Sequence, residues 1–370
     1  MSTLRNILAS NVKNIIGGTR VPEKMIILES DDWGSNRIAS RDDFKNLVKA
    51  GILNDKSSTY DRCDTIARTE DLEILFDILS SVKDKNGNSA IITPFFNVVN
   101  PDFDKIRESD YQVYHYETFI QTLEKTGEEN GVLNLWKEGI AKGLVIPAYH
   151  GREHLCVPLW MKYLRNDDKR VKEAFRHHFY AVPKVLGLTN MAGAFRPSLY
   201  FDNEAQMKFN GAALVDGIRL VTEILETKIS VFAPPNGISH LYFDKLLSEN
   251  GIKLIHNTRR YEPDGKGSGV LAKRKANEYN QKYYNRTCAF EPSYSNNALD
   301  ICLHQIQGAF NWHKPAIIST HRVNYMGYIS PSNRDKGISQ LQQLLKAIVK
   351  KWPDVVFASS NDYANILLNK

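Results

Sequence analysis

Two segments of this sequence carry side chains of the kinds that bind metal ions and transfer protons. Asp31 and Asp32 are adjacent carboxylates that follow the apolar run 25–28. His150 and His154 stand four residues apart, which places both imidazoles on one face of a helical turn. That spacing lets the two imidazoles hold one metal ion, while neighbouring carboxylates at a strand end can take different chemical roles.

Two further strand ends carry residues of chemical interest. His321 follows the apolar run 316–320, and the rigid turn 234–237, Pro-Pro-Asn-Gly, follows the apolar run 230–233. A lone histidine at a strand end is more often structural than catalytic, and a turn with two prolines needs no catalytic explanation. His321 nevertheless lies at the third strand end with a titratable group, which favours a functional role for it.

The elements that must position these residues are short apolar strands that alternate with helices. We expect strands at about 25–28, 90–93, 144–148, 192–195, 230–233, 253–256, 316–320 and 355–358. We expect helices at about 69–85, 159–188, 239–250, 297–313 and 336–351, a helical insertion at 101–142, and a surface excursion at 262–296. This alternation predicts an α/β fold with a parallel sheet, most simply closed as a barrel, whose strands deliver the groups above to one rim.

Composition bounds the classes of protein. The 370 residues, of which 42% are hydrophobic and 24% charged, suffice for a sizeable core, and no linker divides the chain, so we expect a single domain over 1–370. The net charge of +6 comes from scattered Lys and Arg without a basic stripe, which argues against nucleic-acid binding. The four cysteines form no CxxC pair, which argues against a cysteine-ligated zinc and suits a reducing compartment.

The N-terminal segment 1–18 places its apolar residues on one helical face but has no long apolar core and no cleavage site typical of a signal peptide. No apolar run is long enough to span a bilayer. We therefore expect a cytoplasmic protein whose first helix packs on the body, with weak membrane-surface contact through residues 1–18 as the alternative. The sequence leaves the oligomeric state open.

In chain order, these segments resemble the motifs of the NodB-type polysaccharide deacetylases. That family is marked by an Asp-Asp motif, an HxxxH motif, an Arg-Pro-Pro-aromatic-Gly turn and a late strand that ends in Leu-x-His. The matching segments here are Ser30-Asp31-Asp32, His150 to His154, Ala233-Pro234-Pro235-Asn236-Gly237 and Ser319-Thr320-His321. The resemblance covers core segments between about 22 and 360, with long insertions at about 100–142, 155–190 and 260–300. It implies a distorted (β/α)7 barrel and, through the insertions, the branch associated with cell-envelope polysaccharide synthesis.

The resemblance also implies one divalent metal ion, most often zinc, with cobalt, nickel or manganese as alternatives. Asp32, His150 and His154 would be its ligands, leaving positions open for water and a substrate carbonyl. Asp31 would be the general base that deprotonates the water, and protonated His321 would donate a proton to the leaving amine. The residues that we expect to contact the substrate are Trp33, Tyr149, Pro234, Pro235 and Asn236. Core packing explains the two aromatic residues equally well.

One position departs from the family pattern. Ala233 stands where the family has an arginine that orients the base. The candidates to supply the missing guanidinium are Arg196, Arg152 and Arg322. We favour Arg196 as a third catalytic residue because it also follows an expected strand, although an ordinary ion pair explains it equally well.

The acidic partner of the catalytic histidine is not evident either, and Glu291 and Asp300 are both candidates to pair with His321. Together, the residues and the resemblance predict a metal-dependent hydrolase that removes an N-acetyl group from a sugar, which is a polysaccharide, an oligosaccharide or an activated precursor. The alternatives are an inactive barrel that serves as a carbohydrate-binding or scaffold module, a carbohydrate O-deacetylase, and a non-haem iron enzyme with the same ligand set. No dinucleotide-binding or P-loop motif occurs.

Overall fold

The computed structural model describes residues 18–369 apart from 55, 184, 186–187, 189–192, 257–258, 263–269 and 274–276. Its centre is strand β1 (Met25–Trp33), in which every residue is buried. β1 pairs in parallel with β12 (Ala316–His321) and β2 (Ile92–Phe96), and along its first residues with β13 (Val356–Ala358). A strand with neighbours on both edges and packed layers on both faces needs apolar residues throughout, which explains the continuous run at its start.

All pairings within the main sheet are parallel. Its nine strands run in the order β10-β7-β6-β5-β2-β1-β12-β11, with β13 paired to β1 outside this path. The other strands of the sheet are β5 (Ala148–Tyr149), β6 (Val231–Phe232), β7 (Leu254–His256), β10 (Lys282–Tyr284) and β11 (Cys288–Ala289). Two antiparallel hairpins pair β3 (Val99–Pro101) with β4 (Tyr116–Thr118) and β8 (Arg259–Glu262) with β9 (Val270–Lys273). The predicted α/β class on a parallel sheet is confirmed.

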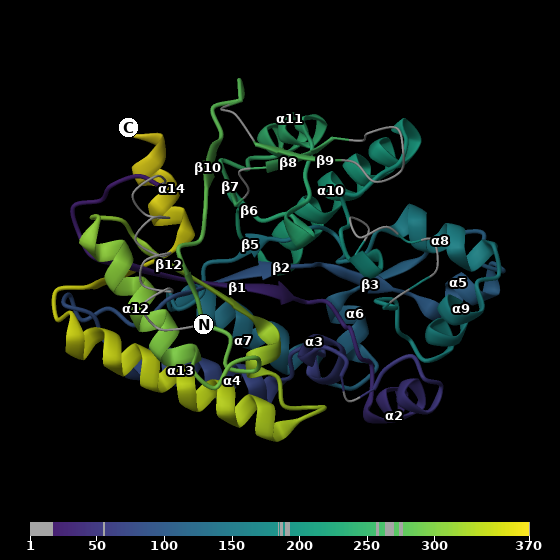
Figure 1. Ribbon diagram of the computed structural model, residues 1–370, viewed down its shortest axis with the longest axis horizontal. Helices are drawn as coiled ribbons and strands as arrows, with labels where there is room; N and C mark the ends of the chain where they lie inside the picture. The colour runs from purple at the N-terminus through teal and green to yellow at the C-terminus, as the bar shows by residue number, and fades with distance from the viewer. Residues whose placement is uncertain are drawn as a thin grey trace.

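Helices cover the sheet, with α4, α12 and α13 on one side and α10 and α11 on the opposite side (Figure 1). The helices are α2 (Arg41–Lys49), α3 (Thr59–Cys63), α4 (Thr69–Ser81), α5 (Phe103–Glu108), α6 (Phe119–Glu124), α7 (Glu129–Ala141), α8 (Val157–Arg165), α9 (Lys169–Arg176), α10 (Glu204–Leu225), α11 (Leu241–Glu249), α12 (Ala298–Asn311), α13 (Pro331–Lys351) and α14 (Ser360–Leu368). Short 3-10 turns lie at η1 (Gly193–Phe195), η2 (Pro235–Gly237) and η3 (Arg322–Tyr325). In α13, buried Leu341, Leu345 and Ile348 recur every three or four positions, as a helix packed along one face requires.

The two edge strands of the sheet, β10 and β11, are consecutive in the chain, and only residues 285–287 separate them. A sheet whose two edges are joined by so short a link has to be curled, so this crossing is the seam of the distorted barrel. The expectation of a surface excursion at 262–296, within the insertion placed at about 260–300, is therefore wrong here. Strands of two or three residues are too short to show a pattern in the sequence, which is why the excursion was expected.

Other expectations also need correction. The helix expected at 159–188 is divided into α8 and α9, because Asp167 between them has a positive φ of 56° and Asp168 caps the second helix. The strand expected at 192–195 is, in its described part, the turn η1, and no helix was expected where α10 lies. Of the N-terminal segment 1–18, residues 1–17 lie outside the described residues. Within the part of the chain that the structure describes, no helix is both long and apolar enough to cross a membrane.

Candidate active site and metal centre

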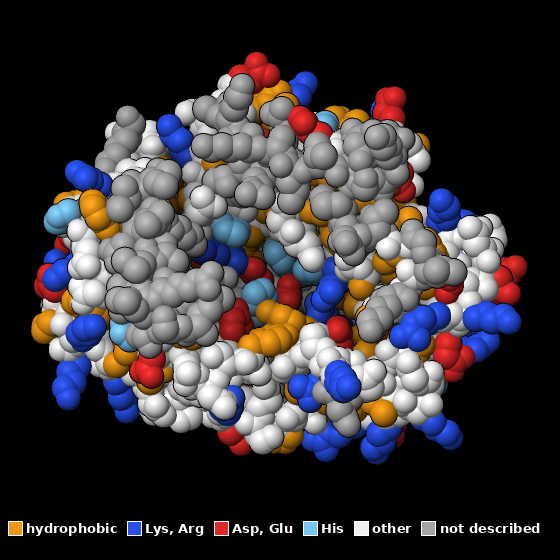
Figure 2. All heavy atoms as spheres, viewed as in Figure 1, with side chains coloured by type: hydrophobic (Ala, Val, Ile, Leu, Met, Phe, Trp, Pro, Cys, Tyr) orange, Lys and Arg blue, Asp and Glu red, His pale blue; other side chains and the backbone are white. Residues whose placement is uncertain are grey.

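A pocket with a volume of about 250 Å³ lies at the carboxyl ends of the parallel strands. Residues from the ends of five strands line it, namely Asp31 of β1, His150 after β5, Ala233 after β6, His256 of β7 and His321 of β12. In the space-filling view the pocket is a hollow near the centre of the molecule, where histidine, acidic and basic side chains gather (Figure 2). The strands therefore bring to one rim the titratable groups that the sequence places at their ends.

Asp31 and Asp32 both line the pocket although successive side chains of a strand normally point to opposite faces. The register of β1 against β2 shifts between Ser30 and Trp33, which marks a β-bulge at the two aspartates. Asp32 has a positive φ of 74°, a left-handed backbone conformation that is uncommon outside glycine. The bulge thus turns the second carboxylate toward the same pocket as the first.

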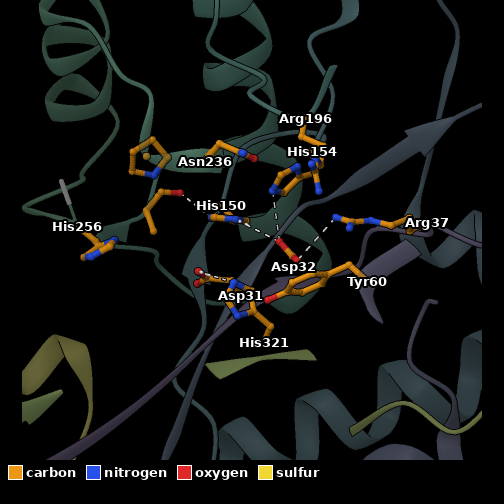
Figure 3. A pocket seen from close by; sticks show the side chains of 13 residues that line it. Asp31, Asp32, Arg37, Tyr60, His150, His154, Arg196, Asn236, His256 and His321 are labelled. Carbon is orange, nitrogen blue, oxygen red and sulfur yellow. Dashed lines mark hydrogen bonds and ion pairs between the residues drawn. The ribbon is translucent and has the colours of Figure 1, made fainter. Parts of the chain in front are cut away.

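Asp32, His150 and His154 form a buried group whose ligand atoms all lie within 4.8 Å of one another. Oδ1 of Asp32 lies 3.4 Å from Nε2 of His150 and 3.4 Å from Nε2 of His154 (Figure 3). Ligands placed at about 2.0–2.2 Å around one tetrahedral ion lie about 3.4 Å apart, whereas direct hydrogen bonds are usually shorter. The three residues therefore fit a divalent metal ion, and the described residues contain no second group of this kind.

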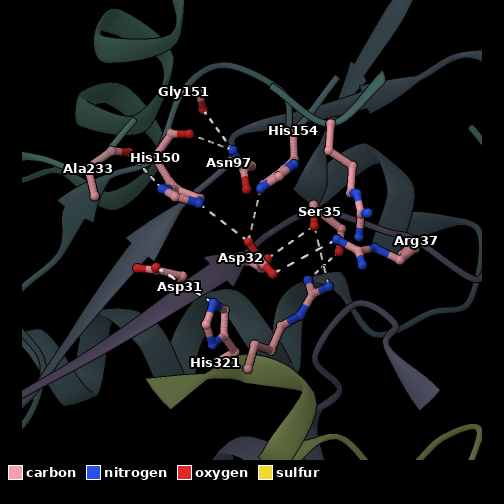
Figure 4. A network of polar contacts seen from close by, with 12 residues as sticks. Asp31, Asp32, Ser35, Arg37, Asn97, His150, Gly151, His154, Ala233 and His321 are labelled. Atoms are coloured by element: carbon pink, nitrogen blue, oxygen red, sulfur yellow. Dashed lines mark hydrogen bonds and ion pairs between the residues drawn. The ribbon is translucent and has the colours of Figure 1, made fainter. Parts of the chain in front are cut away.

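Hydrogen bonds orient His150 as a ligand. Its Nδ1 lies 2.7 Å from the carbonyl oxygen of Ala233, which can only accept, so Nδ1 carries a proton and Nε2 is the nitrogen that faces Asp32. Asn97, which follows β2, donates to the carbonyl oxygen of His150 at 2.8 Å (Figure 4). Both contacts come from neighbouring strand ends, so the sheet itself positions the first histidine of the HxxxH segment.

Burial and the charges within the group together set its charge states. Burial lowers the pKa of His154 to about 3, although the Asp32 carboxylate opposes the shift. Burial alone would raise the pKa of Asp32, but the imidazoles of His154 and His150 hold it well below its usual range. At neutral pH the carboxylate is therefore ionised and the His154 imidazole is neutral, which are the forms that bind a metal ion.

The Asp31 carboxylate is held by Arg286, a residue that no sequence motif indicated. Nη1 of Arg286 donates to Oδ2 of Asp31 at 2.5 Å, and Nη2 donates to Oδ1 at 2.6 Å. Nε of Arg286 donates to buried Glu29 at 2.5 Å, and the guanidinium lies over the ring of Phe95. Burial alone would raise the pKa of Asp31, but Arg286 above all lowers it below its usual range, so this carboxylate is ionised at neutral pH.

The expectation that Arg196 orients Asp31 is therefore wrong. Arg196 lines the pocket, but Nε of its guanidinium donates to the carbonyl oxygen of Gly193 at 3.0 Å. The other two candidates pair elsewhere, Arg152 with Glu153 and Asp216, and Arg322 with Asp64 and Ser35. The guanidinium comes instead from the seam between β10 and β11, where Arg286 is the middle residue of the three-residue link between two very short strands.

His321 pairs with Glu291 and not with Asp300, which is exposed on α12. Nδ1 of His321 lies 2.6 Å from Oε1 of Glu291, whose Oε2 accepts from Asn324 at 2.8 Å. Burial alone would lower the pKa of His321, but the Glu291 carboxylate raises it to about 9. The imidazole is therefore protonated at neutral pH, with Nε2 lying 3.9 Å from Oδ2 of Asp31 as a proton donor to the pocket.

The residues expected to contact the substrate divide into two sets. Pro234 and Asn236 line the pocket, whereas Pro235 is buried and does not. Trp33 and Tyr149 are fully buried in the core, which corrects that expectation. Trp33 packs edge-on against another tryptophan, and the Tyr149 hydroxyl donates to a backbone carbonyl.

Tyr60 is an aromatic residue that does line the pocket. It lies on α3, and its ring centroid is 5.0 Å from that of His321 in an edge-on arrangement and 5.0 Å from that of Tyr294. A helix of five residues offers too few positions for a periodic pattern, and α3 follows no strand end, so no signal in the sequence marks Tyr60.

The fold and the pocket define an α/β protein with a candidate metal centre at the rim of a curled parallel sheet. A scan against models of protein families found no match to the sequence. A search of the curated proteins also found no match.

Solved structures with a similar chain trace do exist. One is a 4-alpha-glucanotransferase from Thermococcus litoralis, at 9% identity and a TM-score of 0.44, with 93% of this chain matched to 40% of that chain. Another is a "putative polysaccharide deacetylase" from Mycobacterium smegmatis, at 12% identity and a TM-score of 0.45, over 94% of this chain and 92% of that chain. A probable polysaccharide deacetylase from Pseudomonas aeruginosa PAO1 is 12% identical with a TM-score of 0.42, over 93% and 90% of the two chains. Likeness at this level does not define an activity, so the function has to be argued from the pocket.

Proposed function

We propose that this chain is a metal-dependent hydrolase that removes an N-acetyl group from a sugar. The observation that carries the proposal is the content of one pocket, which joins an Asp-His-His group, the ionised Asp31 and the protonated His321. Amide hydrolysis needs three matching functions, because the carbonyl must be polarised, a water must lose a proton, and the leaving nitrogen must gain one.

Asp32, His150 and His154 would hold the metal ion. An ion bound there would supply Lewis acidity, which polarises an acyl carbonyl and makes a water easier to deprotonate. Two imidazoles and one carboxylate are a ligand set of catalytic zinc sites, so zinc is the first choice. Cobalt, nickel and manganese accept the same donors and are the alternatives.

Asp31 would act as the general base. The two hydrogen bonds from Arg286 fix the plane of its carboxylate, and each oxygen keeps a further lone pair for the proton of a water. The low pKa of Asp31 keeps the carboxylate ionised over the physiological range of pH. Arg286 is then a positioning residue, which acts through Asp31.

His321 would act as the general acid. Attack of the water oxygen on the acyl carbon forms the C–O bond, and the C–N bond can break only when the nitrogen gains a proton, since an amide anion is too basic to leave. With a pKa of about 9, His321 holds that proton at neutral pH, and Glu291 stabilises its charged form. Asp31 then releases to solvent the proton that it took from the water, neutral His321 regains a proton from solvent, and acetate and the free amine leave.

The alternatives are less well supported. Ala233 was the reason to consider an inactive barrel, and Arg286 weakens that reason because a guanidinium reaches the base from another segment. An O-deacetylase would depend less on a general acid such as His321, since an alkoxide is a better leaving group than an amide anion. In a non-haem iron enzyme with the same ligands, the Asp31 and His321 pair would have no defined task.

The proposal is tested by metal content and by acetate release from N-acetylated hexosamine monosaccharides and oligosaccharides. We expect about one zinc-like ion per chain and metal-dependent acetate release, both lost in a His150→Ala/His154→Ala double variant. His177→Ala/His178→Ala removes a histidine pair outside the pocket and is the matched control. Metal without acetate release would favour the inactive module, and the absence of metal in protein never exposed to chelator would overturn the ligand assignment.

A further inference from the structure

Arg196 is a cation in the wall of the candidate active site that the proposed reaction does not use. It lines the same pocket as Asp32 and lies beside His154 (Figure 3). Its guanidinium donates from Nε to the carbonyl oxygen of Gly193 at 3.0 Å. Among the described residues no carboxylate lies within ion-pair distance of Arg196, and the charges of Asp61 and Asp32 act on its guanidinium only from farther away.

The neighbouring cations, by contrast, are matched. Arg37 lies 3.7 Å from Asp61 and 3.6 Å from Asp64, and Arg322 lies 2.7 Å from Asp64. Arg37 also lines the pocket, but its charge and that of Arg322 are balanced by these two aspartates. Arg196 is thus the arginine in this part of the pocket wall that has no ion-pair partner among the described residues.

An unmatched and partly buried guanidinium is electrostatically unfavourable. The pKa of Arg196 is accordingly lowered from its usual value, first by burial and next by the positive charge of Arg37. An anion beside Arg196 would relieve the repulsion between the two arginines. The planar fork of a guanidinium suits the paired oxygens of a carboxylate or a phosphate.

We propose that Arg196 binds an anionic oxygen group, a carboxylate or a phosphate, that the sugar substrate carries close to its reacting N-acetyl group. The inference rests on the proposed function and assigns the class of sugar that the same pocket selects. Asn236 lies near Arg196 in the close view of the pocket and would contact the same part of the sugar (Figure 3).

The proposal predicts selection for charged over neutral sugars. A neutral N-acetyl sugar offers only hydroxyl groups to Arg196 and leaves its charge uncompensated. One charge-assisted hydrogen-bonded pair is expected to favour the charged sugar about tenfold or more in Kd.

The test measures binding instead of turnover. Zinc-loaded protein with Asp31→Asn, which lacks the proposed base, is titrated by calorimetry with N-acetylglucosamine, N-acetylglucosaminuronic acid and N-acetylglucosamine 6-phosphate. Arg196→Gln is then added to this background, and Arg219→Gln, which removes an exposed arginine of α10, is the matched control. We expect a charged sugar to bind about tenfold or more tightly than the neutral one, with the preference lost in Arg196→Gln and kept in Arg219→Gln. The tighter of the two charged sugars identifies the anionic group.

Equal binding of neutral and charged sugars, or a preference that survives Arg196→Gln, would overturn the inference. Zinc content and Tm verify that Arg196→Gln is folded. If it is not, Arg196→Lys replaces it, because a lysine keeps the positive charge without the planar guanidinium. This variant is expected to retain part of the preference for charged sugars. Acetate release from neutral sugars without any charge preference would leave the proposed function standing and the inference overturned. A charge preference that depends on Arg196, with no acetate released by the wild type, would support the anion site and overturn the proposed function.

Discussion

Asp31 and His321 face each other in register across β1 and β12, with Oδ2 of Asp31 3.9 Å from Nε2 of His321. Since both residues belong to hydrogen-bonded strands, the sheet sets their separation. Each is also held by a partner of opposite charge, Arg286 for the aspartate and Glu291 for the histidine. The proton acceptor and the proton donor are therefore charged and oriented before a substrate binds.

Arg286→Lys is expected to impair the base of the reaction. A lysine keeps the charge but cannot bridge both oxygens of Asp31 while also reaching Glu29, so the carboxylate loses its fixed plane. Since Arg286 is the main group that lowers the pKa of Asp31, this pKa should rise, and the low-pH limb of kcat/KM should move to higher pH. We expect kcat/KM to fall about 10- to 100-fold, measured as acetate release across the pH range.

Arg196→Gln is the matched control for that experiment, because it removes a different arginine from the same pocket. With a neutral substrate it should leave the low-pH limb where it is in the wild type. A shift of this limb in Arg196→Gln, with no shift in Arg286→Lys, would return the orienting role to Arg196.

Glu291→Gln is expected to lower the pKa of His321 from its value of about 9, because the Glu291 carboxylate is the main group that opposes the effect of burial. The high-pH limb of kcat/KM should move to lower pH by the same amount. NMR titration of the His321 imidazole measures the shift directly. Asp300→Asn, on the exposed face of α12, should leave the titration unchanged, and an unchanged titration in Glu291→Gln would exclude Glu291 as the partner.

The same ion pair should make stability depend on pH. A histidine whose pKa is raised on folding stabilises the native state fully below its unfolded value of about 6.5. This contribution is lost as the pH rises through the folded value of about 9. We therefore expect the free energy of unfolding, measured by urea titration, to fall between these two pH values in the wild type. The fall should be smaller in Glu291→Gln, and an equal fall in both proteins would contradict the assignment.

Sequence patterns could locate Asp32, His150 and His321 because each lies at or just past the carboxyl end of a strand in a parallel sheet. The carboxyl ends of such strands meet at one rim, so position along the chain translates into proximity. Arg286 could not be found in this way. β10 and β11 are strands of three and two residues, and the seam between them exists only once the sheet has curled.

The sequence pattern also does not predict whether the side chain of a strand-end residue points into the pocket or into the core. Trp33 was expected to contact the substrate, but the bulge at Asp31 and Asp32 changes the alternation just before it, and its ring enters the core. The positive φ of Asp32 is imposed by the tertiary structure, and a β-strand pattern in the sequence does not indicate it. The sequence thus predicts that Asp31 and Asp32 take part in the chemistry, but it does not predict the backbone conformation that brings both carboxylates into one pocket.

Zinc is expected to raise the Tm of the wild type, because a ligand that binds only the folded state stabilises it by mass action. With free zinc at about 100 times its Kd, the gain is about 2.7 kcal/mol. The His150→Ala/His154→Ala variant should show no such rise. His256→Ala removes another histidine of the pocket, outside the ligand group, and should keep it. A rise that survives the loss of both ligands would place the metal elsewhere.

Gly34→Ala is expected to damage the metal site through the backbone. Gly34 has a φ of 83°, and an added Cβ would overlap the carbonyl oxygen of Asn97. Asn97 in turn holds the carbonyl oxygen of His150 with its side-chain amide. We expect the free energy of unfolding to fall by about 2 kcal/mol or more, from backbone strain and overlap together, and the affinity for zinc to fall as well.

Gly143→Ala separates the two causes. Gly143 also has a positive φ, of 69°, but no neighbouring atom lies within 4 Å of an added Cβ, so this variant carries the backbone strain alone. It should cost about 1 kcal/mol and leave zinc binding unchanged, because it touches nothing that holds His150. Equal losses of stability and equal zinc affinities in the two variants would show that the overlap with Asn97 is relieved locally, and that Asn97 does not couple Gly34 to the metal ligands.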